Sequence, residues 1–157
     1  MNLIKQLNTS NDMKTTFLTT RNLISQIPSI TWVDKDKGQL ENYDSMPPIP
    51  PNSVLITVNI NRTQEIGDGR KIWFVSIIIR FYADVVKSET SNKAPDEAVE
   101  RSLKYYDDVE AIYDKLQDYT DNELDTFNMQ SAAEESRRDG LTIMRFVFNT
   151  SFVRLIA

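Results

Sequence analysis

The chain has 157 residues, of which 40% are hydrophobic and 26% charged, and its formal net charge is −5. These values are typical of one globular domain, and they exclude a collagen-like, low-complexity or wholly disordered chain. The sequence has no cysteine and no histidine, which excludes disulfides, thiolate nucleophiles, imidazole bases and the usual zinc ligands. We therefore expect a single domain over residues 1–157, with residues 1–11 as a candidate flexible arm.

No apolar run approaches the ~18–20 residues that span a bilayer, and the N-terminus lacks the apolar segment of a secretory signal. We therefore expect a cytoplasmic protein without membrane contact. Residues 1–90 hold ten basic and nine acidic side chains, whereas Pro95–Asp125 alone holds three basic and eleven acidic ones. Such an acidic segment repels a phosphate backbone, so we expect no sequence-specific nucleic-acid binding.

The first third of the chain predicts a helix, a short strand and an extended connection. Apolar side chains recur at spacings of three and four residues, which predicts an amphipathic helix over residues 12–26 with Asp12 as its N-cap. The β-branched and aromatic run Ile30–Val33 predicts a brief strand. Four prolines between residues 47 and 51 favour an extended connection, ordered only by contact with the sheet or a neighbouring molecule.

The centre of the chain predicts a β-hairpin. Residues 54–61 alternate in type, and Lys71–Val85 has the strongest strand pattern in the chain. Between them, Gly67-Asp68-Gly69 marks a turn that can take positive φ. No helix follows these glycines directly, so they predict a hairpin turn and not a phosphate-binding loop.

The last third predicts a long helix from Pro95 to about Asp118 and then a second hairpin, formed by a weaker strand at Leu124–Ala132 and a final strand at Leu141–Leu155. This order of elements predicts an α+β fold. We expect a mainly antiparallel sheet of about four to five strands built from two hairpins, with the N-terminal helix and the long helix packed on one face.

The best candidate for chemistry is the pair Asp34 and Asp36, with Glu41 and Asp44 nearby, because clustered carboxylates can hold Mg²⁺ for phosphoryl transfer. A solvated turn has the same composition and is the favoured interpretation. Serine–histidine hydrolysis is excluded because the chain has no histidine. We expect no enzymatic activity, and we assign no catalytic, cofactor-binding or metal-binding residue.

Two surfaces are candidates for contact with other molecules. Both faces of the strand Lys71–Val85 are apolar, and the face opposite the helices needs a cover that either the proline-rich segment or a neighbouring protomer could supply. The acidic surface of the long helix is either solvated or turned toward a basic partner or a lumen through which an anionic polymer passes. The candidate interface residues are Ile72, Phe74, Ile78 and Tyr82, and the candidate acidic surface is Asp107, Asp108, Glu110, Asp114 and Asp118.

The stretch from Trp32 to Tyr43, with the pattern W-x-D-x-D-x-G-Q-L-x-N-Y, precedes a proline-rich segment and resembles small phage or prophage proteins encoded among head–tail and tail genes. The layout of helix, hairpin, long helix and hairpin resembles the tail-terminator and tail-completion proteins of long-tailed phages. This resemblance implies a non-enzymatic protein that forms a ring, commonly a hexamer. The ring caps the tail tube and joins it to the head connector, with DNA passing through.

The resemblance also implies partners and a location. The partners are further copies of the chain, the tail-tube protein and the head-connector protein, and no cofactor is needed. The protein works in the host cytoplasm during assembly and then in the virion tail or neck. Two alternatives stay open: a small Mg²⁺-dependent nuclease or phosphotransferase that uses Asp34 and Asp36, and a monomeric adaptor encoded in a mobile element.

Overall fold

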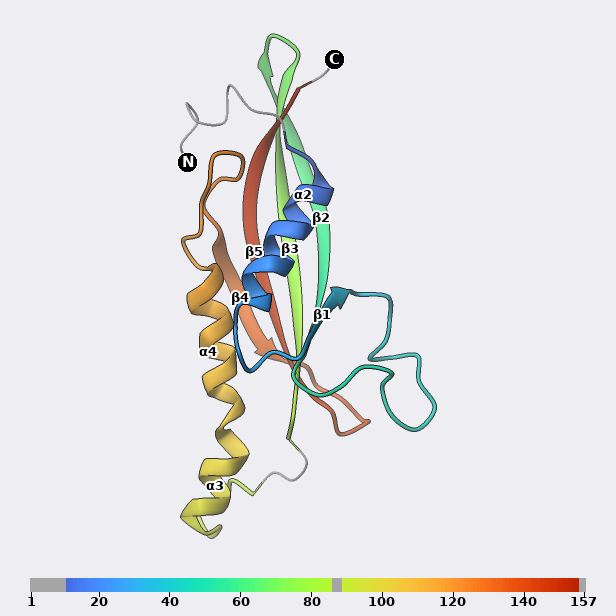
Figure 1. Ribbon diagram of the computed structural model, residues 1–157, viewed down its shortest axis with the longest axis vertical. Helices are drawn as coiled ribbons and strands as arrows, with labels where there is room; N and C mark the ends of the chain where they lie inside the picture. Colours follow the sequence, from blue (N-terminus) through green and yellow to red (C-terminus); the bar gives the residue numbers. More distant parts are fainter. Residues whose placement is uncertain (1–10, 86–88, 156–157) are drawn as a thin grey trace.

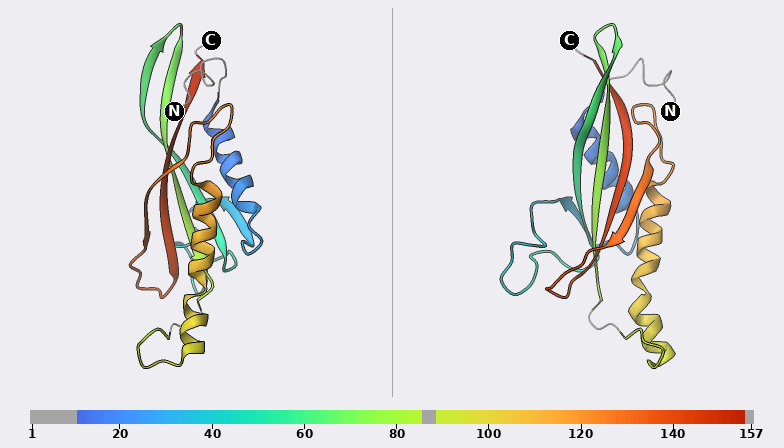
Figure 2. Two further views of the ribbon diagram at one scale, coloured as in Figure 1. Left: turned by 90° about the vertical axis from the view of Figure 1, so that its left-hand side faces the viewer. Right: turned by 180° about the vertical axis from the view of Figure 1, so that it is seen from behind.

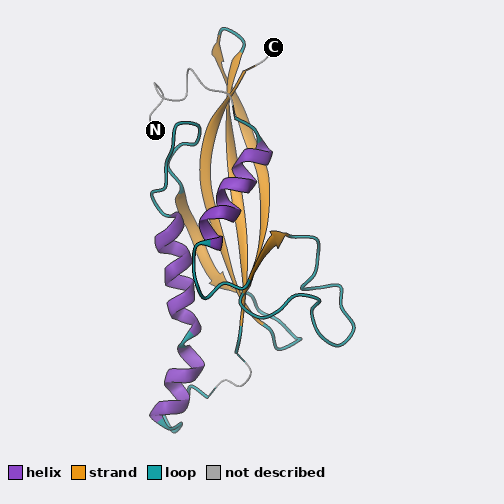
Figure 3. Ribbon diagram, viewed as in Figure 1, coloured by secondary structure: helices purple, strands orange, loops and turns teal. Residues whose placement is uncertain are grey.

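The computed structural model describes residues 11–85 and 89–155, which form an α+β fold with a five-stranded, mostly antiparallel sheet (Figure 1). The strands follow the spatial order β1-β2-β3-β5-β4. The N-terminal helix and the second part of the long helix lie on one side of this sheet, and the first part of the long helix extends beyond its end (Figures 2 and 3). The predicted fold class is therefore confirmed. The described elements are α2 (Met13–Ser25), β1 (Trp32–Lys35), β2 (Ser53–Gly67), β3 (Arg70–Ala83), α3 (Asp96–Leu103), α4 (Tyr105–Leu116), β4 (Asn128–Glu134) and β5 (Thr142–Leu155).

The long hairpin β2–β3 is the centre of the sheet. β3 pairs along its full length with β5, and β1 adds a short parallel strand to the first residues of β2. Gly67, Asp68 and Gly69 all take positive φ at the hairpin turn, as the sequence predicts. The register of the hairpin shifts twice near this turn, between Ile60 and Arg62 and again between Glu65 and Gly67.

Several boundaries differ from those that the sequence predicts. The short strand lies two residues later than Ile30–Val33, because it aligns with β2 through the parallel register that starts at Trp32 and Ser53. The weaker strand begins at Asn128, and Leu124 forms only an isolated bridge with Phe152. Tertiary pairing, which local composition does not reveal, decides both boundaries.

Helix α2 begins as its sequence predicts. The Asp12 carboxylate accepts a hydrogen bond of 2.7 Å from the Thr15 N–H, which satisfies one of the unpaired donors of the first turn. Thr16 and Thr20 lie on the buried face, where each hydroxyl donates to the carbonyl four residues earlier. The helix can therefore bury polar side chains against the sheet without leaving them unpaired.

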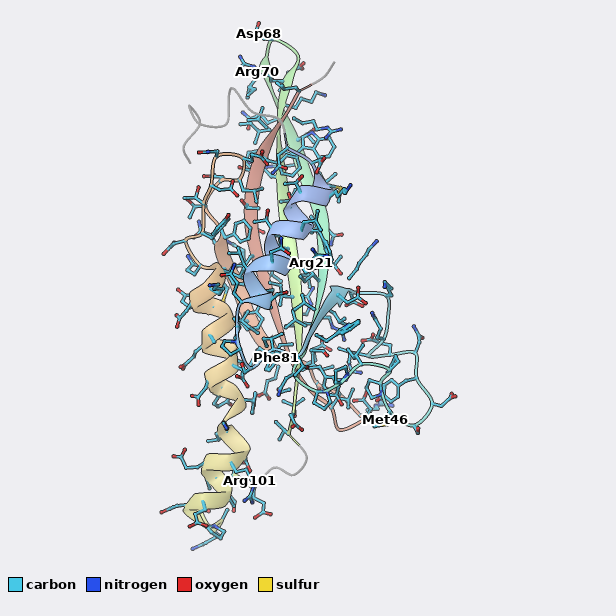
Figure 4. The ribbon with its side chains drawn as sticks, viewed as in Figure 1. Arg21, Met46, Asp68, Arg70, Phe81 and Arg101 are labelled. Atoms are coloured by element: carbon cyan, nitrogen blue, oxygen red, sulfur yellow. The ribbon has the colours of Figure 1, made fainter. Side chains whose placement is uncertain are left out.

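The long helix is bent into α3 and α4 at Lys104. Neither proline nor glycine causes the bend. Instead, the buried Ser102 hydroxyl donates to the Ala98 carbonyl at 2.7 Å and accepts the Glu89 N–H at 2.9 Å. A serine that bonds back to its own helix in this way often bends that helix. Figure 4 shows Arg101 on α3 at the opposite end of the molecule from Asp68 and Arg70 at the hairpin tip.

The core lies between the sheet and the helices α2 and α4. Alternate residues of β3, from Val75 to Ala83, point into it, together with phenylalanines of β5. Of the predicted N-terminal arm, residues 1–10 lie outside the described residues. Asn11, its last residue, donates its backbone N–H to the Val153 carbonyl at 3.0 Å. The fully buried aromatic side chains are Phe81, Phe127, Phe146, Phe148 and Phe152.

Replacing Phe148 with alanine is expected to lower the free energy of unfolding by about 3–5 kcal/mol, because this side chain is fully buried among the strands and helices. The midpoint of urea denaturation measures the change. Met46→Ala is the control, since Met46 is 73% exposed in the loop before β2 (Figure 4). Similar midpoints for the two variants would contradict the described core.

Candidate interaction surfaces

The loop between β1 and β2 covers one end of the sheet face that carries no helix. Leu40 and Ile49 of this loop are buried against Leu55 and Ile143, and Tyr82 packs on the same cluster. The loop therefore packs on the sheet through these side chains, and part of the second apolar face is covered from within the chain.

The remainder of this face is only half-covered. Ile72 is buried, and the Arg62 guanidinium lies 3.7 Å from the centre of the Phe74 ring, a cation–π contact that shields the aromatic face. Between these residues and the loop, Ile78 is half-buried. Whether a neighbouring protomer contacts Ile72, Phe74, Ile78 and Tyr82 stays a prediction.

Charged side chains fasten the loop to the sheet. Arg80 extends from β3 on the loop side and donates to Glu135 through two bonds of 2.8 Å. It also donates to Asp36 at 3.2 Å and pairs with Glu41. Only 11% of the Arg80 side chain is exposed, so the three carboxylates are needed to compensate a nearly buried charge.

Arg137 completes this cluster from the turn between β4 and β5. It donates to Asp139 at 2.6 and 2.9 Å, to Glu135 at 2.9 Å and to the Leu40 carbonyl. The Tyr43 hydroxyl donates to Asp139 at 2.8 Å. We call Arg80, Arg137 and their carboxylate partners the arginine network; its carboxylates are Asp36, Glu41, Glu135 and Asp139.

The arginine network lowers the pKa of two carboxyl groups. Burial alone raises the pKa of Glu135, but the hydrogen bonds from Arg80 and Arg137 outweigh it and the net shift is downward. The Arg137 guanidinium, together with the Tyr43 hydroxyl, holds the pKa of Asp139 far below its usual range. Both carboxyl groups are therefore ionised at neutral pH and bind the arginines as anions.

The motif from Trp32 to Tyr43 supplies most of the loop's side of the network. Gly38 has φ +83°, and a Cβ there would lie 2.5 Å from the Asn42 side chain, so the tight turn requires glycine. The Asp36 carboxylate accepts the Gly38 N–H at 3.0 Å as well as Arg80. The Asp34 carboxylate accepts bonds from the Lys37 ammonium and the Lys35 N–H. Asp36 thus belongs to the turn that the favoured interpretation expects, whereas Asp34 lies within β1, paired in register with Leu55, because the strand extends to Lys35.

The two aspartates do not meet further carboxylates in a geometry suited to a cation. Within residues 11–85 and 89–155 no group of three or more acidic side chains could hold a metal ion. Arginine side chains lie where the carboxylates converge. The arginines and carboxylates form ion pairs that hold the loop between β1 and β2 in position.

The acidic surface lies on the outer side of α4. Asp107, Glu110 and Asp114 are exposed, Asp108 is half-buried, and Asp118 follows the helix with φ 64°. Tyr106 and Tyr113, 44% and 38% exposed, lie among these carboxylates. The spacing of three and four residues along this helix predicts that Tyr106 and Tyr113 face the core, but the structure exposes both rings, because Ile112 and Leu116 are the buried residues.

A groove between α2 and β2, which the sequence does not predict, lies on the helix-covered face at the edge of the sheet opposite α4. It has a volume of about 270 Å³. Met13 and Phe17 of α2 and Ile56 and Val58 of β2 form its apolar lining, and Lys14 and Lys35 also line it. The groove exists because β1 ends at Lys35 and leaves the later residues of β2 without a neighbouring strand.

The chain matches no protein-family model, and no curated protein is significantly similar to it. In the part of the chain that the structure describes, each helix is too short or too polar to cross a lipid bilayer.

Replacing Arg80 with alanine is expected to lower the free energy of unfolding by about 2–4 kcal/mol and to expose the loop at residues 36–52, because three carboxylates lose their cation. Limited proteolysis followed by mass spectrometry measures cleavage in the loop. Arg145→Ala is the matched control, since Arg145 is opposite Arg80 in the register but is exposed and forms no ion pair in the described residues. Equal cleavage of both variants would contradict the role of the network.

The contribution of Glu135 is expected to depend on pH. Because its folded pKa is lowered from 4.5, the stability that it contributes is present above about pH 4.5 and is lost as the pH falls through the folded value. Glu135→Gln should therefore lower the free energy of unfolding by about 1–2 kcal/mol at pH 7 and by much less at pH 3. Urea denaturation at the two pH values tests this, and a difference that does not shrink at pH 3 would refute it.

Proposed function

We propose that this chain is a structural protein of a phage or prophage tail or neck, which acts as a tail terminator. In this role, copies of the chain form a ring, expected to have six subunits, that caps the tail tube and joins it to the head connector. The observation that carries the proposal is the order of the elements. The N-terminal helix, long hairpin, bent helix and second hairpin follow the layout on which the resemblance rests.

The geometry of the Trp32–Tyr43 motif supports a structural role. Asp36 and Glu41 pair with Arg80, and Tyr43 reaches Asp139 across the loop. Because the side chains of this motif bind the loop to the sheet, few of its polar groups are available for catalysis or for metal binding. This use favours the structural function over the Mg²⁺-dependent alternative, which needs Asp34 and Asp36 as metal ligands.

The partners follow from this role: further copies of the chain, the tail-tube protein and the head-connector protein. No cofactor and no sequence-specific contact with nucleic acid are needed, because DNA only passes through the ring. The protein is then present in the host cytoplasm during assembly and in the virion tail or neck afterwards.

The purified protein is expected to form a ring of fixed stoichiometry, either in solution at high concentration or on the ends of tail tubes. Size exclusion coupled to light scattering, run at rising concentration, measures the mass in solution. Co-sedimentation with tail tubes, followed by electron microscopy, measures binding at the tube ends. A protein that stays monomeric in every condition and is never retained on tubes would refute the proposal.

The enzymatic alternative has a separate test. A nuclease or phosphotransferase activity that depends on a divalent ion, survives repurification and disappears in Asp34→Ala would replace the structural function. A matched substitution, Asp44→Ala, alters a neighbouring exposed carboxylate that has no bond with Arg80 in the described residues and controls for loss of charge alone.

A further inference from the structure

The two edges of the sheet are built differently. At the β4 edge, α4 lies alongside the strand (Figure 1). The Gln117 side chain accepts the Met129 N–H at 2.8 Å, and the Tyr105 hydroxyl donates to Glu134. The helix therefore lies along this edge without enclosing it: β4 stays largely exposed, and Glu110 and Tyr113 line a cavity of about 290 Å³ between α4 and β4. At the opposite edge, β1 and β2 leave the groove beside α2 open.

The outer surface of α4 carries both apolar area and negative charge. Tyr106, Glu110 and Tyr113 follow one another at four and three residues, so they form one stripe along the helix. Both tyrosine rings are more than one third exposed. Asp107 and Asp114 flank the stripe, and none of these carboxylates forms an ion pair with a residue that the structure describes. Half-exposed tyrosine rings are typical of a surface that contacts another protein, and the carboxylates beside them favour a partner of opposite charge.

The groove at the opposite edge has complementary chemistry. Phe17 and Val58 line the groove and are half-buried. Both side chains pack at the margin of the hydrophobic core. Lys14 and Lys35 are exposed, and neither ammonium group forms an ion pair within residues 11–85 and 89–155. An apolar groove with two such lysines fits a helix that presents aromatic rings and carboxylates.

We propose that α4 of one copy of the chain docks into the groove between α2 and β2 of the next copy. The tyrosine stripe covers Phe17 and Val58, and Glu110 and Asp114 approach Lys14 and Lys35. Because both surfaces belong to one chain and lie at opposite edges of its sheet, the contact is head-to-tail. Repetition of such a contact closes a ring when the rotation between copies permits it.

This inference rests on the proposed function in one respect, which is that a ring of copies is the working form. It also selects among the three roles that the sequence leaves open for the acidic residues, which are a solvated face, a surface toward a basic partner and a surface toward a lumen. They face a basic partner, the neighbouring copy, and not the lumen.

Charge reversal with rescue tests the contact. Lys14→Glu with Lys35→Glu places acid in the groove, and Glu110→Lys with Asp114→Lys places base on the helix. Each pair alone creates like-charge repulsion and should raise the concentration needed for assembly at least about tenfold. The chain with all four changes restores opposite charges and should assemble within about threefold of the unaltered chain. The control for the lysine pair is Lys93→Glu with Arg138→Glu, which changes the net charge by the same amount and in the same direction at exposed positions away from the groove.

Cross-linking locates the contact directly, and the absence of cysteine in the chain makes introduced thiols unique. Val58→Cys and Tyr113→Cys chains are mixed and treated with a short bis-maleimide, in solution at high concentration and on tail tubes. The expected product is a dimer that contains one chain of each variant. Circular dichroism of each variant before assembly establishes that its fold is intact.

The outcomes separate the inference from the proposed function. If rings form but charge reversal has no effect, or if Tyr113→Cys chains link only to each other, the head-to-tail contact is wrong and the ring stands. If the mixed cross-link and the rescue are observed but the rings never bind tail tubes, the contact stands and the tail-terminator function fails. A monomer in every condition refutes both.

Discussion

Both faces of this sheet are apolar, so each face needs a cover that excludes water. Helices cover only one of the two faces. Helices α2 and α4 bury the first face of the sheet, with alternate residues of β3 and the phenylalanines of β5 beneath them. The second face depends on a loop without regular structure, whose two main apolar contacts, Leu40 and Ile49, cover one end. Ordering a loop costs conformational entropy, and the burial of two apolar side chains does not readily offset this free energy. The loop therefore needs further contacts with the sheet.

The arginine network supplies that attachment, and its chemistry explains why it lies where it does. Arg80 occupies a strand position between apolar residues, where a charge is costly unless it is paired and hydrogen-bonded. Its planar guanidinium donates several bonds at once, and lysine could not reproduce this geometry. Because Glu135 and Arg137 come from the β4–β5 turn, the same contacts join two segments far apart in sequence. The loop, the strand and the turn are therefore stabilised together.

Local patterns predict the elements of this fold better than their partners. The spacing in α2, its Asp12 cap and the Gly67–Gly69 turn act over a few residues, so the sequence shows them directly. The pairing of β3 with β5 and the parallel addition of β1 join distant segments, and no local pattern encodes them. An arginine within an apolar strand, such as Arg80, indicates that carboxylates must pair with it. The local sequence does not identify Asp36, 44 residues away, as one of these partners. The groove beside α2 had no sequence signal, because it results from where β1 ends.

The two register shifts in the β2–β3 hairpin bear on how large any assembly of this chain grows. Beyond β1, the outer edge of β2 exposes backbone groups that could pair with a strand of another molecule and so begin an unlimited sheet. Each shift places an irregularity in this stretch, and such bulges bend the strand and increase its local twist. A bent and twisted edge is a poor template for a straight incoming strand. The hairpin thereby discourages edge-to-edge pairing of β2 with a strand of another molecule.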